Sequence, residues 1–260
     1  MSDKKSVFNE TLDLGYQESL KTVDYEQFKN ILSNRRSIRV FKDQLLPEDV
    51  VKNALHDGLL APNSSNLQPW HFIWVRNDKI KKELAVNCFS QNGAKTASDL
   101  IICVAKTNTW KENCKKMLSQ FEKSELETPK VVNDYYTKIA PAAYGLIGPF
   151  GILSPLKWLL LNTLGLFKVM AREPIWPSQL KTWAVKTTAL ACENIMLSLS
   201  AQGGDSLPME GFDSKRVKKM FGLGRHDHIV MIIGCGYRED RGVYGPRMRF
   251  NSSEFIQEIR

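Results

Sequence analysis

Cysteine is scarce in this chain of 260 residues, and the pattern of its five cysteines excludes two kinds of site. Their number is odd, they are scattered, and no two form a C-x-x-C pair. A disulfide framework needs paired cysteines and a structural zinc site needs closely spaced ligands, so neither is expected. Unpaired thiols of this kind are typical of a reducing compartment, and the expected location is the cytoplasm.

Long uninterrupted apolar runs are also missing. Residues 140–156 carry no charge, but three prolines and three glycines interrupt them. A helix that crosses a bilayer needs about 20 apolar residues without such breaks, so no membrane span is expected. The lysines within residues 1–9 are not followed by an apolar run, and no secretory signal is expected either.

Acidic residues are outnumbered, with 28 Asp and Glu against 36 Lys and Arg and a net charge of +8. Such a surplus attracts nucleic acid, acidic lipid or phosphorylated cofactors. The basic stretch at residues 215–219 lacks the interleaved aromatic side chains of nucleic-acid binding motifs, so nucleic acid is not an expected partner. With 43% hydrophobic residues, the composition is that of an ordinary globular protein, and residues 1–260 are predicted to form a single domain.

The densest group of cations lies at residues 35–39, where three arginines and a serine occupy five positions. A guanidinium presents a planar fork of donors that matches phosphate oxygens, and it stays charged at any working pH. If the chain is extended here, Ser37, Arg39 and Phe41 share one face, and the apolar residues between them share the other. The segment can then hold an anion while its apolar side anchors in a core. On these residues alone, a solvated basic turn explains the pattern better.

Hydrophobic periodicity predicts the regular elements. Helices are expected over residues 25–32, 48–59, 80–89 and 178–202, and buried strands over residues 70–75, 100–105 and 229–235. Residues 207–212 are predicted as a turn-like loop, and Asp213 as the cap of a short basic helix. Within residues 108–177, the apolar part is predicted as a pair of short buried helices, with a hydrophobic lid or a contact patch as the alternative.

Six segments carry a more specific signal. They are RRSIRVF at residues 35–41, APNSSNLQPWHF at 61–72, Gln91 with Ala97, ACENIML at 191–197, PMEGFD at 208–213 and PRMR at 246–249. Each is weak alone, but together and in this order they resemble the FMN-dependent nitroreductase family. The match covers roughly residues 25–107 and 178–250 and leaves residues 108–177 without a counterpart.

The resemblance implies an α+β fold built as a three-layer sandwich, in which a mixed, mainly antiparallel sheet carries helices on both faces. It also implies an intertwined homodimer with two FMN sites at the subunit interface, each drawing on both subunits. Residues 108–177 would form a variable, lid-like insert. Residues 237–260 would form a C-terminal arm that embraces the partner.

The resemblance further implies which residues contact FMN. Arg35, Ser37, Arg247 and Arg249 would hold the phosphate, with Arg36 nearby, and Arg39 and Gln91 would approach the pyrimidine edge of the flavin. Pro62, Asn63, Ser64, Ser65 and Asn66 would reach the partner's flavin, and Pro208, Met209, Glu210 and Gly211 would present backbone N–H groups to N5 and O4. The match around Gln91 needs a one-residue adjustment, so either Ser90 or Gln91 faces the flavin.

The activity implied is hydride transfer from NADH or NADPH through flavin N5 to a small-molecule acceptor, such as a nitroaromatic or a quinone, by a ping-pong scheme. Because the cofactor carries the chemistry, no catalytic side chain and no metal are expected. Two alternatives stay open. One is a quinone reductase that makes weak membrane-surface contact through residues 140–167, and the other is a flavin-binding or storage protein with little turnover.

Overall fold

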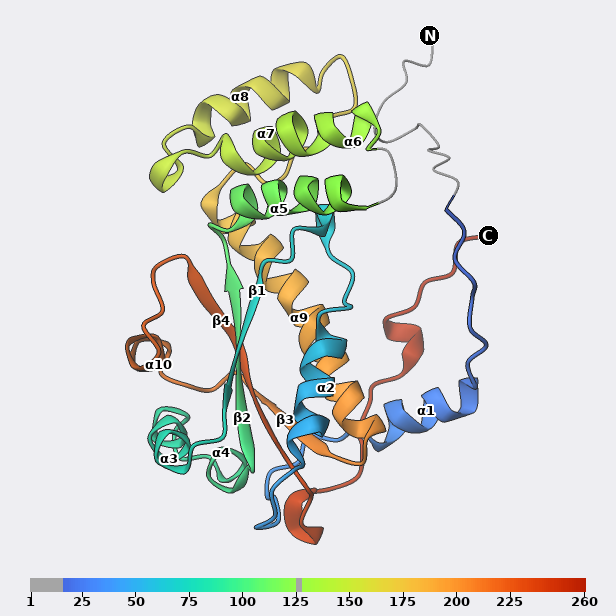
Figure 1. The fold of residues 1–260 in the computed structure, drawn as a ribbon, viewed down its shortest axis with the longest axis vertical. Helices are drawn as coiled ribbons and strands as arrows, with labels where there is room; N and C mark the ends of the chain where they lie inside the picture. The colour runs from blue at the N-terminus through green and yellow to red at the C-terminus, as the bar shows by residue number, and fades with distance from the viewer. Residues whose placement is uncertain (1–15, 125–127) are drawn as a thin grey trace.

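A computed structural model describes residues 16–124 and 128–260. Its centre is a four-stranded sheet in the order β1-β2-β4-β3 (Figure 1). The strands are β1 (Trp70–Val75), β2 (Asp99–Lys106), β3 (Asp205–Met209) and β4 (Asp227–Gly236). All their pairings are antiparallel, and parallel pairing in the described ranges is confined to a bridge between Ser37 and Ser206. The α+β class is confirmed, but the strands form an antiparallel sheet rather than a mixed one.

Helices cover both faces of this sheet, as the three-layer arrangement requires (Figure 1). One face carries α3 (Asp78–Asn87), α4 (Asn92–Thr96) and α10 (Ser214–Met220), and the other carries α2 (Glu48–Gly58) and α9 (Pro177–Ala201). Helix α1 (Tyr25–Asn34) packs against the end of α9, where Ser200 Oγ donates to Ile31 O. The predicted helices over residues 25–32, 48–59, 80–89 and 178–202 are all confirmed.

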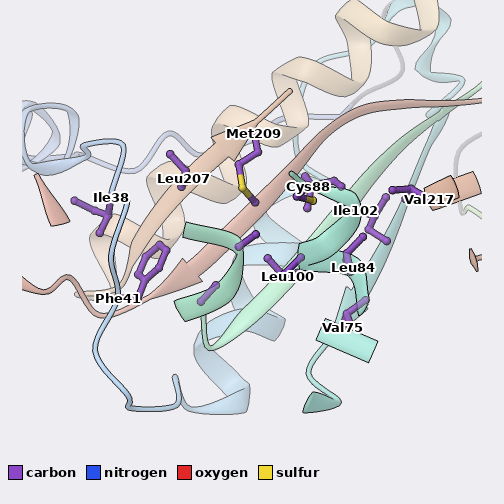
Figure 2. Close-up of a cluster of buried hydrophobic side chains, with 14 of the residues drawn as sticks. Ile38, Phe41, Val75, Leu84, Cys88, Leu100, Ile102, Leu207, Met209 and Val217 are labelled. Carbon is purple, nitrogen blue, oxygen red and sulfur yellow. The ribbon is translucent and has the colours of Figure 1, made fainter. Parts of the chain in front are cut away.

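Strand β2 is the centre of the core because helices cover it on both sides. Its side chains alternate between two clusters of buried residues. Leu100 and Ile102 join the cluster beneath α3 and α4, which Figure 2 shows, and Ile101 and Cys103 join the cluster beneath α2 and α9. The apolar run at residues 100–105 therefore forms a buried strand, as predicted.

Helix ends follow local signals in the sequence. Asp24 accepts hydrogen bonds from two backbone N–H groups in the first turn of α1, and Asp213 does the same for α10. Helix α9 has Pro177 at its first position and ends just before Gly203, whose φ is 78°. Each of these residues acts within its own turn, so its effect is predictable without the tertiary structure.

A glycine brings α2 and α9 close together. A Cβ added at Gly58 would lie 2.6 Å from Ile195 Cγ1 and 3.3 Å from Ala191 O. The backbone of α2 at Gly58 therefore packs directly against the side chain of Ile195 in α9. Any larger residue here would push α2 away from α9 and the sheet.

The prediction of a turn-like loop at residues 207–212 is wrong for residues 207–209, since β3 extends to Met209, but holds for residues 210–212, which are irregular. Strand β3 lies at an edge of the sheet, where it pairs with β4 along its length and with Ser37 through an isolated bridge at Ser206. Proline is tolerated on edge strands, so Pro208 does not prevent pairing there. Pro208 is therefore a local turn signal that strand pairing overrides, whereas Gly211 lies beyond the end of the strand.

Two further expectations about exposure are wrong. Phe41 does not share an exposed face with Arg39, because the backbone bends at residues 39–40 and the ring is only 3% exposed (Figure 2). Strand β1 forms as predicted, but Val75 is its one fully buried residue. Strand β1 is an edge strand with β2 as its single neighbour among the described strands, so much of its surface stays accessible.

Within residues 108–177, the described residues (108–124 and 128–177) form a separate helical layer at one end of the sheet (Figure 1). It contains α5 (Trp110–Lys123), α6 (Lys130–Asp134), a π-helical turn (Tyr135–Ile139), α7 (Ala140–Gly145) and α8 (Ser154–Leu164). Helix α7 is anchored by the buried Tyr144, whereas α8 buries only Ser154 and Lys157. The expected pair of short buried helices is therefore wrong for α8. Among the described residues, no helix is long and apolar enough to cross a membrane.

The C-terminal segment, residues 237–260, contains two short 3-10 turns, Asp240–Gly242 and Ser252–Glu254. It passes α1, where Arg247 Nη2 donates to Ser33 O at 2.9 Å. Tyr237 and Val243 pack against the core, but the apolar side chains beyond them are exposed, including Met248 and Phe250 at 78% and 79%. Exposed apolar side chains on an extended segment leave it able to pack against a partner.

One prediction about stability arises in β4. Burial, together with the charges of Lys181 and Lys218, lowers the pKa of His228 to about 4. Between the usual pKa of about 6.5 and this value, the unfolded chain binds more protons than the folded one. The free energy of unfolding should therefore fall as the pH drops through this window. Urea midpoints from pH 6.5 to 5 should fall less in His228→Gln than in the wild type.

The matched control is His56→Gln, because His56 is exposed on α2. It should retain the full wild-type decline. An equal decline in His228→Gln would show that His228 does not contribute.

Candidate functional site

Two distant segments meet around a cavity of about 170 Å³. Its lining residues are Arg35, Arg36, Ser37, Arg39, Pro246, Arg247, Met248 and Arg249. The two segments lie about 200 positions apart in the sequence, and Arg36 Nη2 joins them by donating to Gly245 O at 2.6 Å. The structure therefore brings all five predicted arginines to one place.

Backbone hydrogen bonds hold this cavity in shape. Ile38 N donates to Ser206 O at 3.1 Å, and Arg39 N donates to Gly242 O at 2.8 Å. Ile38 is fully buried (Figure 2), which confirms the predicted apolar anchor of the arginine segment. Arg247 Nη2 closes the other side by donating to Arg35 O at 2.6 Å. The segment that carries Arg35, Arg36 and Arg39 is therefore held against the core and is not a loose turn.

The cavity carries unbalanced positive charge. The ion pairs that arginines form in the described residues involve Arg76, Arg216, Arg238, Arg241 and Arg260, and none of the five cavity arginines. Burial and the neighbouring charges of Arg249, Arg35 and Arg36 lower the pKa of Arg247. Like charges held together without a counter-ion favour binding of an anion, and a phosphate matches the forked geometry of guanidinium donors.

Arg39 lies at the rim of the cavity. Its guanidinium carbon is 5.1 Å from the centre of the Tyr244 ring, and its Nη1 donates to Ser37 O at 3.5 Å. The contact with Tyr244 directs this exposed side chain without neutralising it. Arg39 can therefore offer a positive charge to a group that extends out of the cavity.

The segment at residues 208–211 adjoins Gln91 rather than Ser90. Gln91 Nε2 donates to Gly211 O at 2.8 Å and to Cys88 O at 3.0 Å. Ser90 instead lines a different cavity, of about 770 Å³, together with Phe41 and Lys95. Of the two residues that the sequence left open, Gln91 therefore adjoins residues 208–211, and Ser90 lies at another cavity.

Backbone groups are what residues 208–211 can offer a ligand. The side chain of Met209 is only 2% exposed and points into the core cluster (Figure 2). At Gly211 an added Cβ would lie 3.4 Å from Gln91 Nε2 and 3.8 Å from the Phe89 ring, both ordinary contacts. The packing of this chain therefore does not demand glycine at position 211. Without a side chain, Gly211 leaves its backbone open to close approach by a ligand.

The predicted loop residues Pro62–Asn66 lie elsewhere. The loop leads into Trp70, which pairs with Ala105 at one end of β1 and β2. The arginine segment pairs with β3 at Ser206, beside Cys235, at the other end of the sheet. At about 3.3 Å per residue, strand β1 alone separates these ends by roughly 17 Å. One protomer therefore does not bring Pro62–Asn66 to the arginine cavity.

This loop has an unusual backbone. Ser65, Asn66 and Gln68 have φ values of 61°, 47° and 43°, in the left-handed region that side chains with a Cβ rarely adopt. Asn63 Oδ1 accepts a hydrogen bond from Gln68 N at 2.8 Å and so closes the loop. Such conformations cluster at functional sites and persist only where neighbouring groups enforce them.

Tyrosines of the helical insert enforce the loop conformation. The hydroxyl of Tyr135 lies 2.5 Å from Ser65 Oγ, that of Tyr144 lies 3.2 Å from the same atom, and Tyr136 donates to Ser65 O at 3.1 Å. Sequence reasoning missed these tyrosines because residues 108–177 had no counterpart in the resemblance. Their only signal was local, a concentration of tyrosine in the stretch between the lysine-rich and apolar parts of the insert.

Removing two of these hydroxyls should loosen the loop. In Tyr135→Phe/Tyr144→Phe, the contacts with Ser65 are lost, and each hydrogen bond contributes about 0.5–1.5 kcal/mol. Amide hydrogen exchange over residues 63–68 should therefore accelerate about tenfold or more. Tyr25→Phe is the matched control, since Tyr25 is exposed on α1. Unchanged exchange in the double variant would show that the tyrosines do not hold the loop.

Comparison with known proteins decides the family. Residues 32–237 match the family model described as the Nitroreductase family, which is more than three quarters of the chain. The chain belongs to the nitroreductase family. The matched span contains the arginine segment, the loop at residues 62–66 and residues 208–211, but ends before Arg247 and Arg249.

Nitroreductase-family relatives have low identity but extensive overlap. The chain is 24% identical over 223 residues to a Thermus thermophilus protein named NADH dehydrogenase, covering 85% of this chain and 91% of that protein. It is 22% identical over 223 residues to the oxygen-insensitive NADPH nitroreductase of Helicobacter pylori, covering 84% and 91%.

Solved structures share the fold. The Bacillus subtilis nitroreductase-family structure ydfN superimposes with a TM-score of 0.74 at 18% identity, covering 91% of this chain and all of that one. A structure from Exiguobacterium sibiricum, described as a nitroreductase in complex with FMN, gives a TM-score of 0.65 at 21% identity and covers 93% and 100%. At these identities the likeness concerns the fold alone.

Proposed function

We propose that this protein is an FMN-dependent oxidoreductase that takes a hydride from NADH or NADPH and passes it to a small-molecule acceptor, a nitroaromatic or a quinone. The observation that carries the proposal is the 170 Å³ cavity whose five arginines have no carboxylate partner among the described residues. The names of the relatives from T. thermophilus and H. pylori support NADH and NADPH as co-substrates, and the E. sibiricum complex supports FMN.

The arginine cavity fits the phosphate of FMN. A phosphate dianion needs several charge-assisted donors, and Arg35, Ser37, Arg247 and Arg249 supply them from two sides. Arg36 has fewer donors left for a phosphate, since its Nη2 already donates to Gly245 O. It therefore contributes charge and holds the C-terminal segment in place.

Arg39 and Gln91 suit the polar edge of the flavin ring. When bound, FMN supplies the N5 atom that accepts and releases the hydride. A cation at Arg39 favours added negative charge on the reduced ring and so raises its tendency to accept a hydride. Gln91 Nε2 is engaged by Gly211 and Cys88, which leaves Gln91 Oε1 to accept a hydrogen bond from a ring N–H group. The backbone at residues 208–211 adds N–H donors beside it.

A complete site requires a second copy of the chain under this proposal. Pro62–Asn66 would serve the partner's site, because the sheet separates them from the arginine cavity of their own protomer. Apolar side chains stay exposed on α1 and on the C-terminal segment, as at Phe28, Leu32 and Phe250. They support a homodimer in which residues 237–260 form the predicted arm, on a single domain with residues 108–177 as its insert.

The test is an absorption spectrum of the purified protein with FMN, taken without oxygen before and after addition of NADH or NADPH. The flavin band should bleach, and a quinone should restore it. Failure to take up FMN would refute the assignment of the arginine cavity. Uptake without bleaching would favour the storage alternative, and comparison of the two nucleotides decides the co-substrate.

A further inference from the structure

Helix α8 buries polar side chains and exposes apolar ones, the reverse of an ordinary surface helix. Such helices bury an apolar stripe and expose polar residues. In α8 the buried residues are Ser154 and Lys157, while Leu156, Leu159 and Leu160 are 67%, 57% and 52% exposed. The helix therefore presents its leucines to its surroundings.

Hydrogen bonds fix this orientation. Ser154 Oγ donates to Ile175 O at 2.7 Å. Lys157 Nζ donates to Ala143 O at 2.6 Å and to Pro174 O at 2.7 Å, and no carboxylate pairs with it among the described residues. The lysine uses its donors on backbone carbonyls of α7 and of the segment before α9. Because these contacts need the polar side facing inward, the leucines must face outward.

Exposed apolar side chains also precede and follow α8 in the sequence. Together with those of α8 we call them the α8 face, which consists of Leu146, Phe150, Ile152, Leu153, Leu156, Trp158, Leu159, Leu160, Leu166, Phe167 and Val169. Single exposed apolar side chains are common, whereas a group of this size marks an interaction surface. Figure 1 shows α8 on the outermost layer of the molecule, farther from the sheet than α5 or α7.

The charges within residues 135–172 have one sign, although Asp134 and Glu173 flank this stretch. Of its cations, Lys138 pairs with Asp134 at 2.7 Å and Lys157 is buried, whereas Lys168 and Arg172 pair with no carboxylate among the described residues. Arg225 adds a further cation, since its guanidinium carbon lies 4.3 Å from the centre of the Phe150 ring. Apolar side chains among cations, with Trp and Phe at the surface, are the features of segments that lie in the interface of anionic membranes.

We propose that the α8 face binds the surface of an anionic lipid bilayer. A second copy of the chain fits less well, because a symmetric contact would bring together Lys168 and Arg225 of both copies, which pair with no carboxylate among the described residues. The apolar side chains of α1 and the C-terminal segment lie apart from α8 in the fold, so the proposed subunit contact does not need this face (Figure 1). Binding would be peripheral, since no described helix can span a bilayer.

This surface has a consequence for the acceptor, which rests on the proposed function. The insert that carries α8 also carries Tyr135 and Tyr144, whose hydroxyls contact Ser65 in the loop proposed to reach the flavin. Docking the α8 face would bring that loop close to the bilayer. A quinone dissolved in the lipid would then be a better acceptor than the same quinone head group in water.

The experiment is flotation of the full chain with vesicles of phosphatidylcholine alone and of phosphatidylcholine mixed with phosphatidylglycerol. The wild type should float with the anionic vesicles, and added salt should reduce the bound fraction. Leu156→Gln/Leu160→Gln removes two apolar side chains without adding charge, and should weaken binding about a hundredfold. Leu45→Gln/Val86→Gln is the matched control, since both residues are exposed and line the cavity beside α3, at the other end of the sheet from the insert (Figure 1).

The outcomes separate the α8 face from the flavin assignment. Absence of the wild type from both vesicle fractions would overturn the proposal, whether or not the protein takes up FMN. Equal flotation of the two double variants would overturn it as well. A smaller oligomer in Leu156→Gln/Leu160→Gln, without vesicle binding by the wild type, would identify a second copy as the occupant. Flotation of a protein that does not take up FMN would uphold the face and refute only the proposed function.

Discussion

Replacing Arg35 and Arg247 together by alanine is expected to weaken FMN binding by about two to four orders of magnitude. Each guanidinium offers the phosphate charge-assisted hydrogen bonds, and loss of one such bond costs about 1.5–3 kcal/mol. Two losses thus correspond to about 3–6 kcal/mol, at 1.4 kcal/mol for each tenfold change in Kd. The measurement is a titration of FMN, followed by quenching of its fluorescence.

The two single variants separate binding from structure. Arg247 Nη2 also holds Ser33 O and Arg35 O, so its loss loosens the C-terminal segment as well. The guanidinium of Arg35 donates to no residue in the described ranges, and Arg35→Ala therefore removes charge with little structural cost. Arg216→Ala is the control, because Arg216 is an exposed arginine on α10. If the double variant binds FMN with wild-type affinity, the phosphate of FMN does not bind in this cavity.

Replacing Asp99 by alanine is expected to lower the free energy of unfolding by about 3 kcal/mol. Asp99 is fully buried and accepts hydrogen bonds from Arg76 Nε and Trp74 Nε1, both at 2.7 Å, and from Ser98 Oγ at 2.6 Å. Removing one partner of a buried ion pair costs about 3–5 kcal/mol. We expect the lower end of this range, because Arg76 would still have a carboxylate partner in Glu48, whose Oε1 lies 3.9 Å from Arg76 Nη1.

The effect of Asp99→Ala is measured by urea unfolding, with attention to the slope as well as the midpoint. Glu112→Ala is the control, because the Glu112–Lys116 pair is exposed on α5 and should leave the midpoint unchanged. A midpoint equal to the wild type in Asp99→Ala would show that solvent replaces the network at no cost. A changed slope would show that the variant no longer unfolds in one step.

Much of the fold followed from patterns a few residues long. The apolar composition of β2 and of the long helix α9 predicts that both are buried. Asp24 and Asp213 predict the starts of their helices, because a capping side chain forms its hydrogen bonds within the first turn of the helix. The arginines of the site were also predictable, but only through the order of six short segments, since residues 35–39 alone fit a solvated basic turn.

What local patterns could not supply was pairing between distant residues. Strand β3 contains Pro208 and precedes Gly211, both turn signals, and it is a strand only because β4 offers an edge. Phe41 is buried because the backbone bends and places its ring against Gly236, 3.0 Å from the position of an added Cβ. The tyrosines of the insert matter only because the fold sets them beside Ser65.

The sequence by itself thus determined the family, the main helices and strands, and the cationic residues that suit a phosphate. The helices and strands depend on neighbours within one turn or one strand, and the family depends on the residue types and the order of six short segments. Only the tertiary structure decided that the two arginine segments form one cavity, that Pro62–Asn66 lie far from it, and that α8 exposes its leucines. Those outcomes depend on contacts between residues that are far apart in the chain, such as the bonds of Lys157 to Ala143 and Pro174, which periodicity does not record.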